Sequence, residues 1–180
     1  MKKALMLTFS KYQDHEVIYP YYRATEDGYD VDIMADTTGR IFGILGTYME
    51  CARSVDELND VKVFNETLQE YDLLIIPGGV KSLEKLRQEG QVLDFIKQWD
   101  AQGKVIACIC HGAQLLISAG VTKGRDISGY YSIRDDIANS GANYVDAPVV
   151  DAGNIITSPH YKWMGPWMKA CLDRVEHTSR

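Results

Sequence analysis

The chain has 180 residues, 46% of them hydrophobic, and a formal net charge of −6 at pH 7. This length and composition fit a single domain over residues 1–180 and exclude a disordered tail, and the scattered Lys and Arg residues argue against nucleic-acid binding. The first apolar run is too short for a signal peptide and no stretch approaches the roughly 20 apolar residues of a membrane span, so we expect a cytoplasmic protein without a membrane partner.

Short apolar strands alternate with amphipathic helices along the chain. In chain order the predicted elements are a strand at residues 4–9, a helix at 16–26, strands at 29–34 and 72–76, a helix around 92–99, a strand at 104–109, a helix at 111–119 and a last helix around 164–175. Strands separated by helix-length segments indicate parallel βαβ units with right-handed crossovers. The predicted fold class is α/β, a doubly wound three-layer α/β/α sandwich with a mostly parallel sheet.

Ligands of such sheets bind beyond the carboxyl ends of the strands. Three of these ends carry residues with chemical potential, namely 10–16, 77–79 and 110–112. The strand at 72–76 (DLLII) is wholly apolar before Pro77-Gly78-Gly79, which is typical of a buried parallel strand that leads into a loop. We therefore expect the functional site at this edge of the sheet.

The strongest chemical signal is the segment ACICHGA at residues 107–113. A buried strand runs into a helix with almost no loop, so Cys110 is predicted to occupy a nucleophile elbow. Such an elbow needs small residues two positions away on either side, here Cys108 and Gly112. A thiol at a helix start is expected to have a lowered pKa and to react as a thiolate. The alternative for Cys110 is an inert buried cysteine, and Cys108 is interpreted as a packing residue.

The four cysteines are too few for a secreted disulfide scaffold and show no second ligand pair at a zinc-like spacing. We expect reduced thiols, no metal site and no organic cofactor.

The chain resembles the PfpI family of the intracellular-protease and Parkinson-protein-seven superfamily over nearly its whole length. The matching segments are EVIYP at 16–20, IPGG at 76–79, CHG at 110–112, LLISAG at 115–120, KGR at 123–125, Tyr130 and RDD at 134–136. The resemblance implies the flavodoxin-like sandwich that this family shares with class I glutamine amidotransferases. It also implies a homodimer or a homohexamer.

The resemblance implies that Cys110 is the nucleophile and that Glu16 hydrogen-bonds its sulfur as a protonated acid. Burial beside a negative sulfur would favour that neutral form. Gly79 and the backbone N–H of His111 are the expected oxyanion donors. The His111 ring either acts as a base or points away from the sulfur. In some members a glutamate of a neighbouring subunit orients this histidine, and Glu84 is the candidate for that role here. The alternative is that Glu84 lies on a solvated helix face, because this chain has one extra residue between the glycine pair and Glu84.

The chain departs from the protease-like branch of the family after residue 158, where it reads PHYKWMGPW. Tyr130, His160 and Trp163 are candidates for the substrate pocket. The alternative for His160 and Trp163 is that they cap and pack the last helix. The apolar, glycine-rich segment 40–48 is expected to line a pocket or an interface.

The leading functional hypothesis is attack by Cys110 on a small carbonyl compound, in glyoxalase- or deglycase-type hydration of 2-oxoaldehydes through a thiohemiacetal. A second hypothesis is another cysteine hydrolase or hydratase acting on an amide, a ring or an isonitrile. A third is a non-enzymatic redox sensor or stress chaperone, in which peroxide oxidises the Cys110 thiol. Methylglyoxal turnover, a covalent adduct and selective oxidation, respectively, would distinguish the three.

Overall fold

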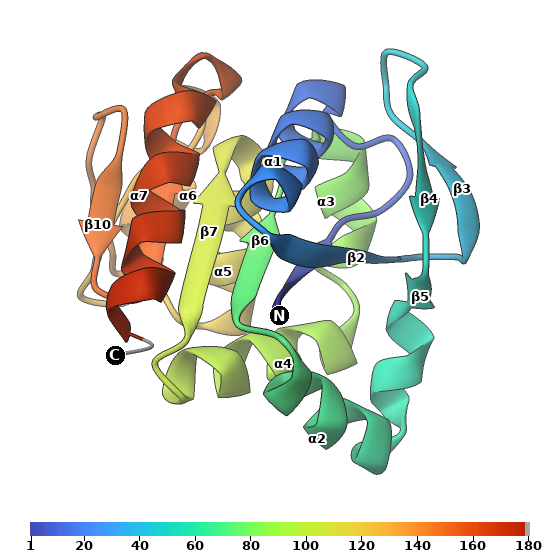
Figure 1. Cartoon of the computed structure of the whole chain (residues 1–180). Coiled ribbons are helices and arrows are strands. Elements are labelled where there is room, and N and C mark those ends of the chain that lie inside the picture. Colours follow the sequence, from blue (N-terminus) through green and yellow to red (C-terminus); the bar gives the residue numbers. More distant parts are fainter. Residues whose placement is uncertain (179–180) are drawn as a thin grey trace.

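The computed structural model describes residues 1–178, which fold around a seven-stranded sheet with helices on both faces (Figure 1). The strands are β1 (Lys2–Leu7), β2 (Tyr29–Ala35), β3 (Gly39–Phe42), β4 (Tyr48–Cys51), β5 (Arg53–Ser54), β6 (Leu73–Ile76), β7 (Val105–Ile109), β8 (Asp126–Ile127), β9 (Asn143–Tyr144), β10 (Val150–Ala152) and β11 (Ile155–Ser158). The helices are α1 (Asp14–Glu26), α2 (Val61–Glu70), α3 (Val80–Leu86), α4 (Gly90–Ala101), α5 (Ala113–Ala119), α6 (Arg134–Asn139) and α7 (Met164–Thr178). The predicted α/β/α sandwich is confirmed.

The strand order of the large sheet is β10-β11-β7-β6-β1-β2-β5. All neighbours in it pair in parallel except β10, which is antiparallel to β11. The central order β2-β1-β6-β7-β11 is that of flavodoxin-like sheets, in which a ligand crevice forms between the first strand and the third. Here that crevice lies between the ends of β1 and β6.

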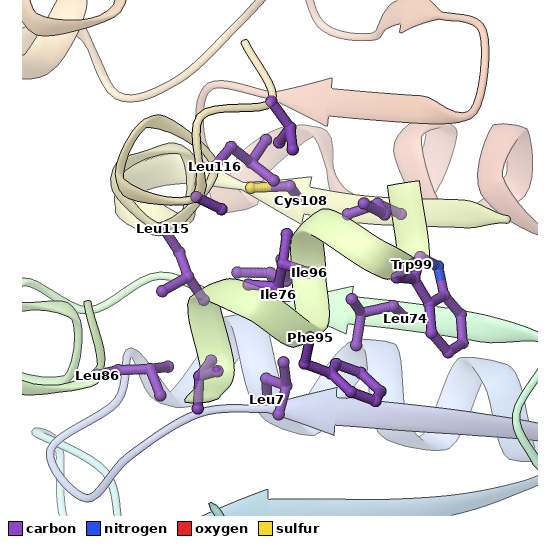
Figure 2. Packing of buried hydrophobic residues seen from close by; sticks show 14 of the residues in the cluster. Leu7, Leu74, Ile76, Leu86, Phe95, Ile96, Trp99, Cys108, Leu115 and Leu116 are labelled. Atoms are coloured by element: carbon purple, nitrogen blue, oxygen red, sulfur yellow. The ribbon is translucent and has the colours of Figure 1, made fainter. Parts of the chain in front are cut away.

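Side chains of β7 alternate between two hydrophobic cores. Ile106 and Cys108 belong to the core under α2, α4 and α5, whereas Ala107 and Ile109 belong to the core under α1 and α7. Figure 2 shows Cys108 in the first core beside Leu116. Strand alternation alone would put Cys110 on the same side as Cys108, but its φ of +60° ends the strand pattern, and Cys110 belongs to the core on the side of α1. Cys108 is a packing residue, as predicted.

Two boundaries differ from the sequence predictions in a way that matters for the site. The strand β1 ends at Leu7 rather than at residue 9, because the backbone N–H of Phe9 donates to Ser82 Oγ at 2.8 Å instead of continuing the sheet. The helix after β7 starts at Ala113, because Cys110–Gly112 form a 3₁₀ turn first. The segment 40–48 lies in a hairpin of β3 and β4, which the βαβ pattern did not predict. Among the described residues, no helix has both the length and the apolar character that crossing a bilayer requires.

Candidate active site

Cys110 sits at a strained turn directly after β7. Its φ is +60°, in the left-handed region, which costs a residue with a side chain about 1–2 kcal/mol. A Cβ on Gly112 would lie 2.7 Å from the carbonyl oxygen of Ile76 and 3.1 Å from Cys108 Sγ. The turn therefore tolerates only small neighbours, and the predicted elbow is present.

Glu16 lies in the first turn of α1 and its side chain points into the protein. It is 0% exposed, and its Oε1 accepts a hydrogen bond of 3.0 Å from the backbone N–H of Gly78. The other oxygen, Oε2, is buried without a conventional hydrogen-bond partner among the described residues. The carboxyl of Glu16 and the thiol of Cys110 are close enough that each affects the pKa of the other. The predicted pairing of carboxyl and thiol is thus present in the fold.

The electrostatics of this pair differ from the sequence prediction. Burial raises the pKa of Glu16 to about 8, so the carboxyl is neutral at pH 7 as expected. Burial, followed by the charge that Glu16 can carry, also raises the pKa of the Cys110 thiol. The prediction of a lowered thiol pKa is wrong for the free protein, because the sulfur is desolvated and the turn beside it is a short 3₁₀ segment instead of a long helix.

The ring of His111 faces the sulfur. Its Nδ1 lies 3.5 Å from Cys110 Sγ, and its Nε2 lies 3.3 Å from the hydroxyl of Ser132. Burial lowers the pKa of His111, so the ring is neutral at pH 7 and one nitrogen can accept a proton. The alternative in which this ring points away is therefore excluded. Sequence reasoning missed Ser132, which lies 21 residues downstream in no recognisable motif.

A cavity of about 330 Å³ opens above Cys110. It is lined by Gln13, Glu16, Ile44, Gly79, Val80, Cys110, His111, Tyr130, His160 and Tyr161. The fold thus brings the predicted Gly79, Tyr130 and His160 together with the nucleophile. Gly79 has φ +114°, and a Cβ there would lie 2.7 Å from the backbone nitrogen of Gln13, so only glycine lets the two loops approach this closely.

Both interpretations of His160 are confirmed, because it caps a turn and lines the cavity. The prediction that Trp163 lines the substrate pocket is wrong. The Nδ1 atom of His160 accepts the backbone N–H of Lys162 at 3.1 Å, which caps the 3₁₀ turn Tyr161–Trp163, and the ring also lines the cavity. Trp163 does not line the cavity, and the Lys162 ammonium lies 5.2 Å from the centre of its ring. The tight turn brings Tyr161 to the cavity wall in its place.

The hairpin loop at 43–47 is held against the cavity by Asp14. This carboxylate accepts the backbone N–H of Leu45 at 2.8 Å, the backbone N–H of Thr47 at 3.1 Å and the hydroxyl of Thr47. Burial opposes ionisation of Asp14, but these hydrogen bonds outweigh it and lower its pKa. Ile44 of this loop lines the cavity, as the pocket interpretation of segment 40–48 predicted.

Glu84 is exposed on α3, and its backbone carbonyl accepts the side chain of Gln88 at 2.9 Å. Its role from a neighbouring subunit stays a prediction. Within residues 1–178, no three His, Cys, Asp or Glu side chains are arranged to hold a metal ion. All four cysteines are buried free thiols.

Comparison with protein families and curated proteins gives one consistent result. The model of the DJ-1/PfpI family matches residues 2–174. Deglycase PfpI of Pyrococcus furiosus is 37% identical over 171 residues, which cover 93% of this chain and 98% of that protein. A putative cysteine protease of Bacillus subtilis, YraA, is 36% identical over 157 residues, which cover 87% of this chain and 88% of that protein.

Solved structures have the same fold. A two-domain protein from Anabaena variabilis, which contains DJ-1/ThiJ/PfpI-like and ferritin-like domains, matches with a TM-score of 0.89 and 27% identity. The match covers 98% of this chain and 48% of that one. DJ-1 of Schizosaccharomyces pombe matches with a TM-score of 0.84 and 22% identity over 97% of this chain and 95% of that one.

Proposed function

The chain belongs to the DJ-1/PfpI family, and we propose that it is a cysteine enzyme of this type that hydrates small 2-oxoaldehydes to hydroxy acids. One observation carries the proposal. The Cys110 thiol is 8% exposed at the base of a small cavity, between the neutral carboxyl of Glu16 and the neutral ring of His111. A desolvated nucleophile with a proton donor on one side and a proton acceptor on the other suits addition to a carbonyl group.

The first step is addition of sulfur to the aldehyde carbon. Because the pKa of Cys110 is raised, the thiol proton has to leave as the S–C bond forms. His111 Nδ1 is the acceptor within reach, at 3.5 Å. Before this transfer the neutral ring carries its proton on Nε2, which donates a hydrogen bond to the Ser132 hydroxyl. This bond fixes the tautomer that accepts a proton at Nδ1. The Glu16 carboxyl protonates or hydrogen-bonds the developing oxyanion, and the product is a thiohemiacetal.

The later steps move one C–H proton without any change in the overall oxidation level. A base removes the hydrogen of the former aldehyde carbon to give an enediol, and the adjacent former ketone carbon is then protonated. Glu16, after giving up its proton, and His111 are the two groups that can carry out this transfer. The result is a 2-hydroxy thioester of Cys110. Water cleaves it to the 2-hydroxy acid and restores the thiol, so the net reaction is addition of one water molecule.

The negative oxygen of each tetrahedral species needs backbone donors. The backbone N–H of His111 already interacts with the Cys110 sulfur, so it points into the reacting region. Gly79 lines the same cavity from the opposite loop. Preorganised donors of this kind typically contribute on the order of 10²–10³-fold to the rate.

Turnover of methylglyoxal to lactate by the purified protein tests the proposal. We expect lactate formation that is abolished in Cys110→Ala and reduced at least 100-fold in Glu16→Gln. Cys171→Ala is the matched control, since this cysteine lies on the buried face of α7 and does not line the cavity. Activity that persists in Cys110→Ala would contradict the proposal.

A cysteine hydrolase is the second candidate, and the similarity to YraA favours it. The same thiol and oxyanion donors suit acyl transfer. A cavity of about 330 Å³ has room for a small amide or ring, which makes a small-molecule hydrolase more plausible than a peptidase. Trapping of an acyl-Cys110 adduct from such a substrate, with no lactate formed from methylglyoxal, would favour this candidate.

A further inference from the structure

One wall of the cavity is a continuous row of rings. Going outward from the nucleophile, the ring centres of His111 and Tyr130 are 4.9 Å apart, those of Tyr130 and His160 are 6.1 Å apart, and those of His160 and Tyr161 are 4.1 Å apart. The ring of His15 stacks on Tyr161 from α1, with ring centres 4.7 Å apart and an interplanar angle of 15°. We call the four lining rings, His111, Tyr130, His160 and Tyr161, the aromatic wall.

The rest of the lining is apolar or uncharged at pH 7. Ile44 and Val80 supply aliphatic surface, and Gln13 supplies an amide. Of the described residues that line the cavity, none is Lys or Arg. The pKa of Glu16 is about 8, and burial, together with the neighbouring Lys162, lowers the pKa of His160. A carboxylate or phosphate on the substrate would therefore lose its hydration without gaining a cationic partner.

From this lining we infer the substrate class of the site: uncharged 2-oxoaldehydes whose substituent is a flat aromatic or conjugated group. The inference rests on the proposed function for the reacting end of the molecule. The aldehyde carbon would meet Cys110, and the flat substituent would lie along the aromatic wall. The cavity volume of about 330 Å³ is at the lower end of the range for ligand sites, which fits a single ring better than a long chain.

Phenylglyoxal and methylglyoxal form a matched pair of probes, since they differ only in a phenyl or a methyl group beside the same 2-oxoaldehyde. Hydration converts phenylglyoxal and one water to mandelate by the steps given above. One favourable aromatic contact is worth about twofold to tenfold in kcat/KM. We expect phenylglyoxal to have the higher kcat/KM by about tenfold, and 4-carboxyphenylglyoxal, which adds a carboxylate to the same 2-oxoaldehyde, to be the poorest of the three substrates.

The role of the wall is tested by Tyr161→Leu, which removes a ring but keeps an apolar side chain. Tyr19→Leu is its matched control, because both tyrosines are 37% exposed but Tyr19 does not line this cavity and lies instead in a separate cavity along α1, beside Ile18 and Met164. Initial-rate measurements give the ratio of kcat/KM for phenylglyoxal to kcat/KM for methylglyoxal. We expect Tyr161→Leu to lower this ratio about fivefold and Tyr19→Leu to leave it unchanged. An equal loss for both substrates in Tyr161→Leu, or turnover of both aldehydes by the unmodified protein without a preference for phenylglyoxal, overturns the inference.

A binding measurement separates this inference from the proposed function. In Cys110→Ala, saturation-transfer NMR should detect bound acetophenone but not acetone, and the acetophenone signal should fall when Tyr161→Leu is added. If neither aldehyde is turned over and acetophenone still binds in this way, the hydration proposal fails while the aromatic specificity stands. If acetophenone does not bind, or binds equally after Tyr161→Leu, the aromatic specificity fails whatever the turnover.

Discussion

The carboxyl oxygen of Glu16 and the backbone N–H of Gly78 are joined by a hydrogen bond of 3.0 Å, although 62 residues separate them in the chain. This bond ties the first turn of α1 to the loop after β6, across the crevice at the centre of the sheet. It also leaves the second oxygen of the carboxyl buried and available to Cys110. The position of the Glu16 carboxyl thus depends on Gly78 in the loop after β6.

Gly78→Ala should remove activity while the fold persists. The added Cβ would lie 2.3 Å from Glu16 Oε1 and 3.0 Å from the Cβ of Cys110, so the carboxyl has to move out of its site. We expect kcat to fall at least 100-fold, with an unchanged circular dichroism spectrum. Gly90→Ala is the control, because a Cβ at Gly90 meets nothing within 4 Å. Full activity in Gly78→Ala would show that the contact with Glu16 is not needed.

Glu16→Gln should make the protein more stable at alkaline pH while it loses activity. The pKa of this carboxyl is about 8 in the folded protein and near 4.5 when unfolded. Between these values the folded state holds a proton that the unfolded state has released, so the free energy of unfolding falls as pH rises, by up to about 1.4 kcal/mol per pH unit. Glutamine has no ionisable proton, so the free energy of unfolding of Glu16→Gln should decline less between pH 5 and pH 8.

Urea unfolding of both proteins at pH 5 and pH 8 measures this difference. We also expect kcat of the unmodified protein to decline above about pH 8, where Glu16 stops being a hydrogen-bond donor. Equal pH slopes of stability in the two proteins would mean that this carboxyl ionises normally.

Ser132→Ala should lower kcat several-fold and leave KM nearly unchanged. Without the hydroxyl, the Nε2–H of His111 loses its acceptor, and the tautomer with the proton on Nδ1, which cannot accept the thiol proton, becomes more populated. The pH–rate profile should therefore change together with kcat, and Ser132→Thr should restore both. A fall in kcat that Ser132→Thr does not rescue would indicate a structural role instead.

Asp14→Ala should raise KM through the loop at 43–47. The change leaves the N–H groups of Leu45 and Thr47 without their acceptor, which costs about 1–3 kcal/mol locally and releases Ile44 from the cavity rim. Because Asp14 is not at the nucleophile, the rate of Cys110 alkylation by iodoacetamide should not fall. Comparison of KM and alkylation rate with those of Asp56→Ala, an exposed carboxylate in the 3₁₀ helix Val55–Asn59, provides the control.

The sheet and the nucleophile were predictable because their signals are local. Alternation of apolar runs with helical periodicity indicated the α/β class, and the short connection between the strand at 104–109 and the next helix indicated the elbow at Cys110. Glu16 is different. Its place in the first turn of a helix fits a solvated carboxylate equally well, and only the family resemblance pointed to the buried acid.

The cavity wall was predicted less well because loops build it. Trp163 and Tyr161 are two positions apart, and which of them reaches the cavity depends on the 3₁₀ turn that His160 caps. Ser132 lies in the 3₁₀ turn Tyr131–Ile133, Gln13 caps α1 and Ile44 lies in the hairpin loop, and contacts with distant residues hold each of these segments. Neither periodicity nor short motifs carry that information.

The strand pairing has a consequence for how the enzyme is made. β1 pairs with β6 through residues as distant as Ala4 and Leu73, and the cavity gathers residues from Gln13 to Tyr161. Contacts this far apart in sequence form late in folding, after the entropy of closing long loops has been overcome. A partly folded chain therefore carries the cysteine without its acid or its cavity walls, and catalytic competence requires the chain from Gln13 to Tyr161 to be in place.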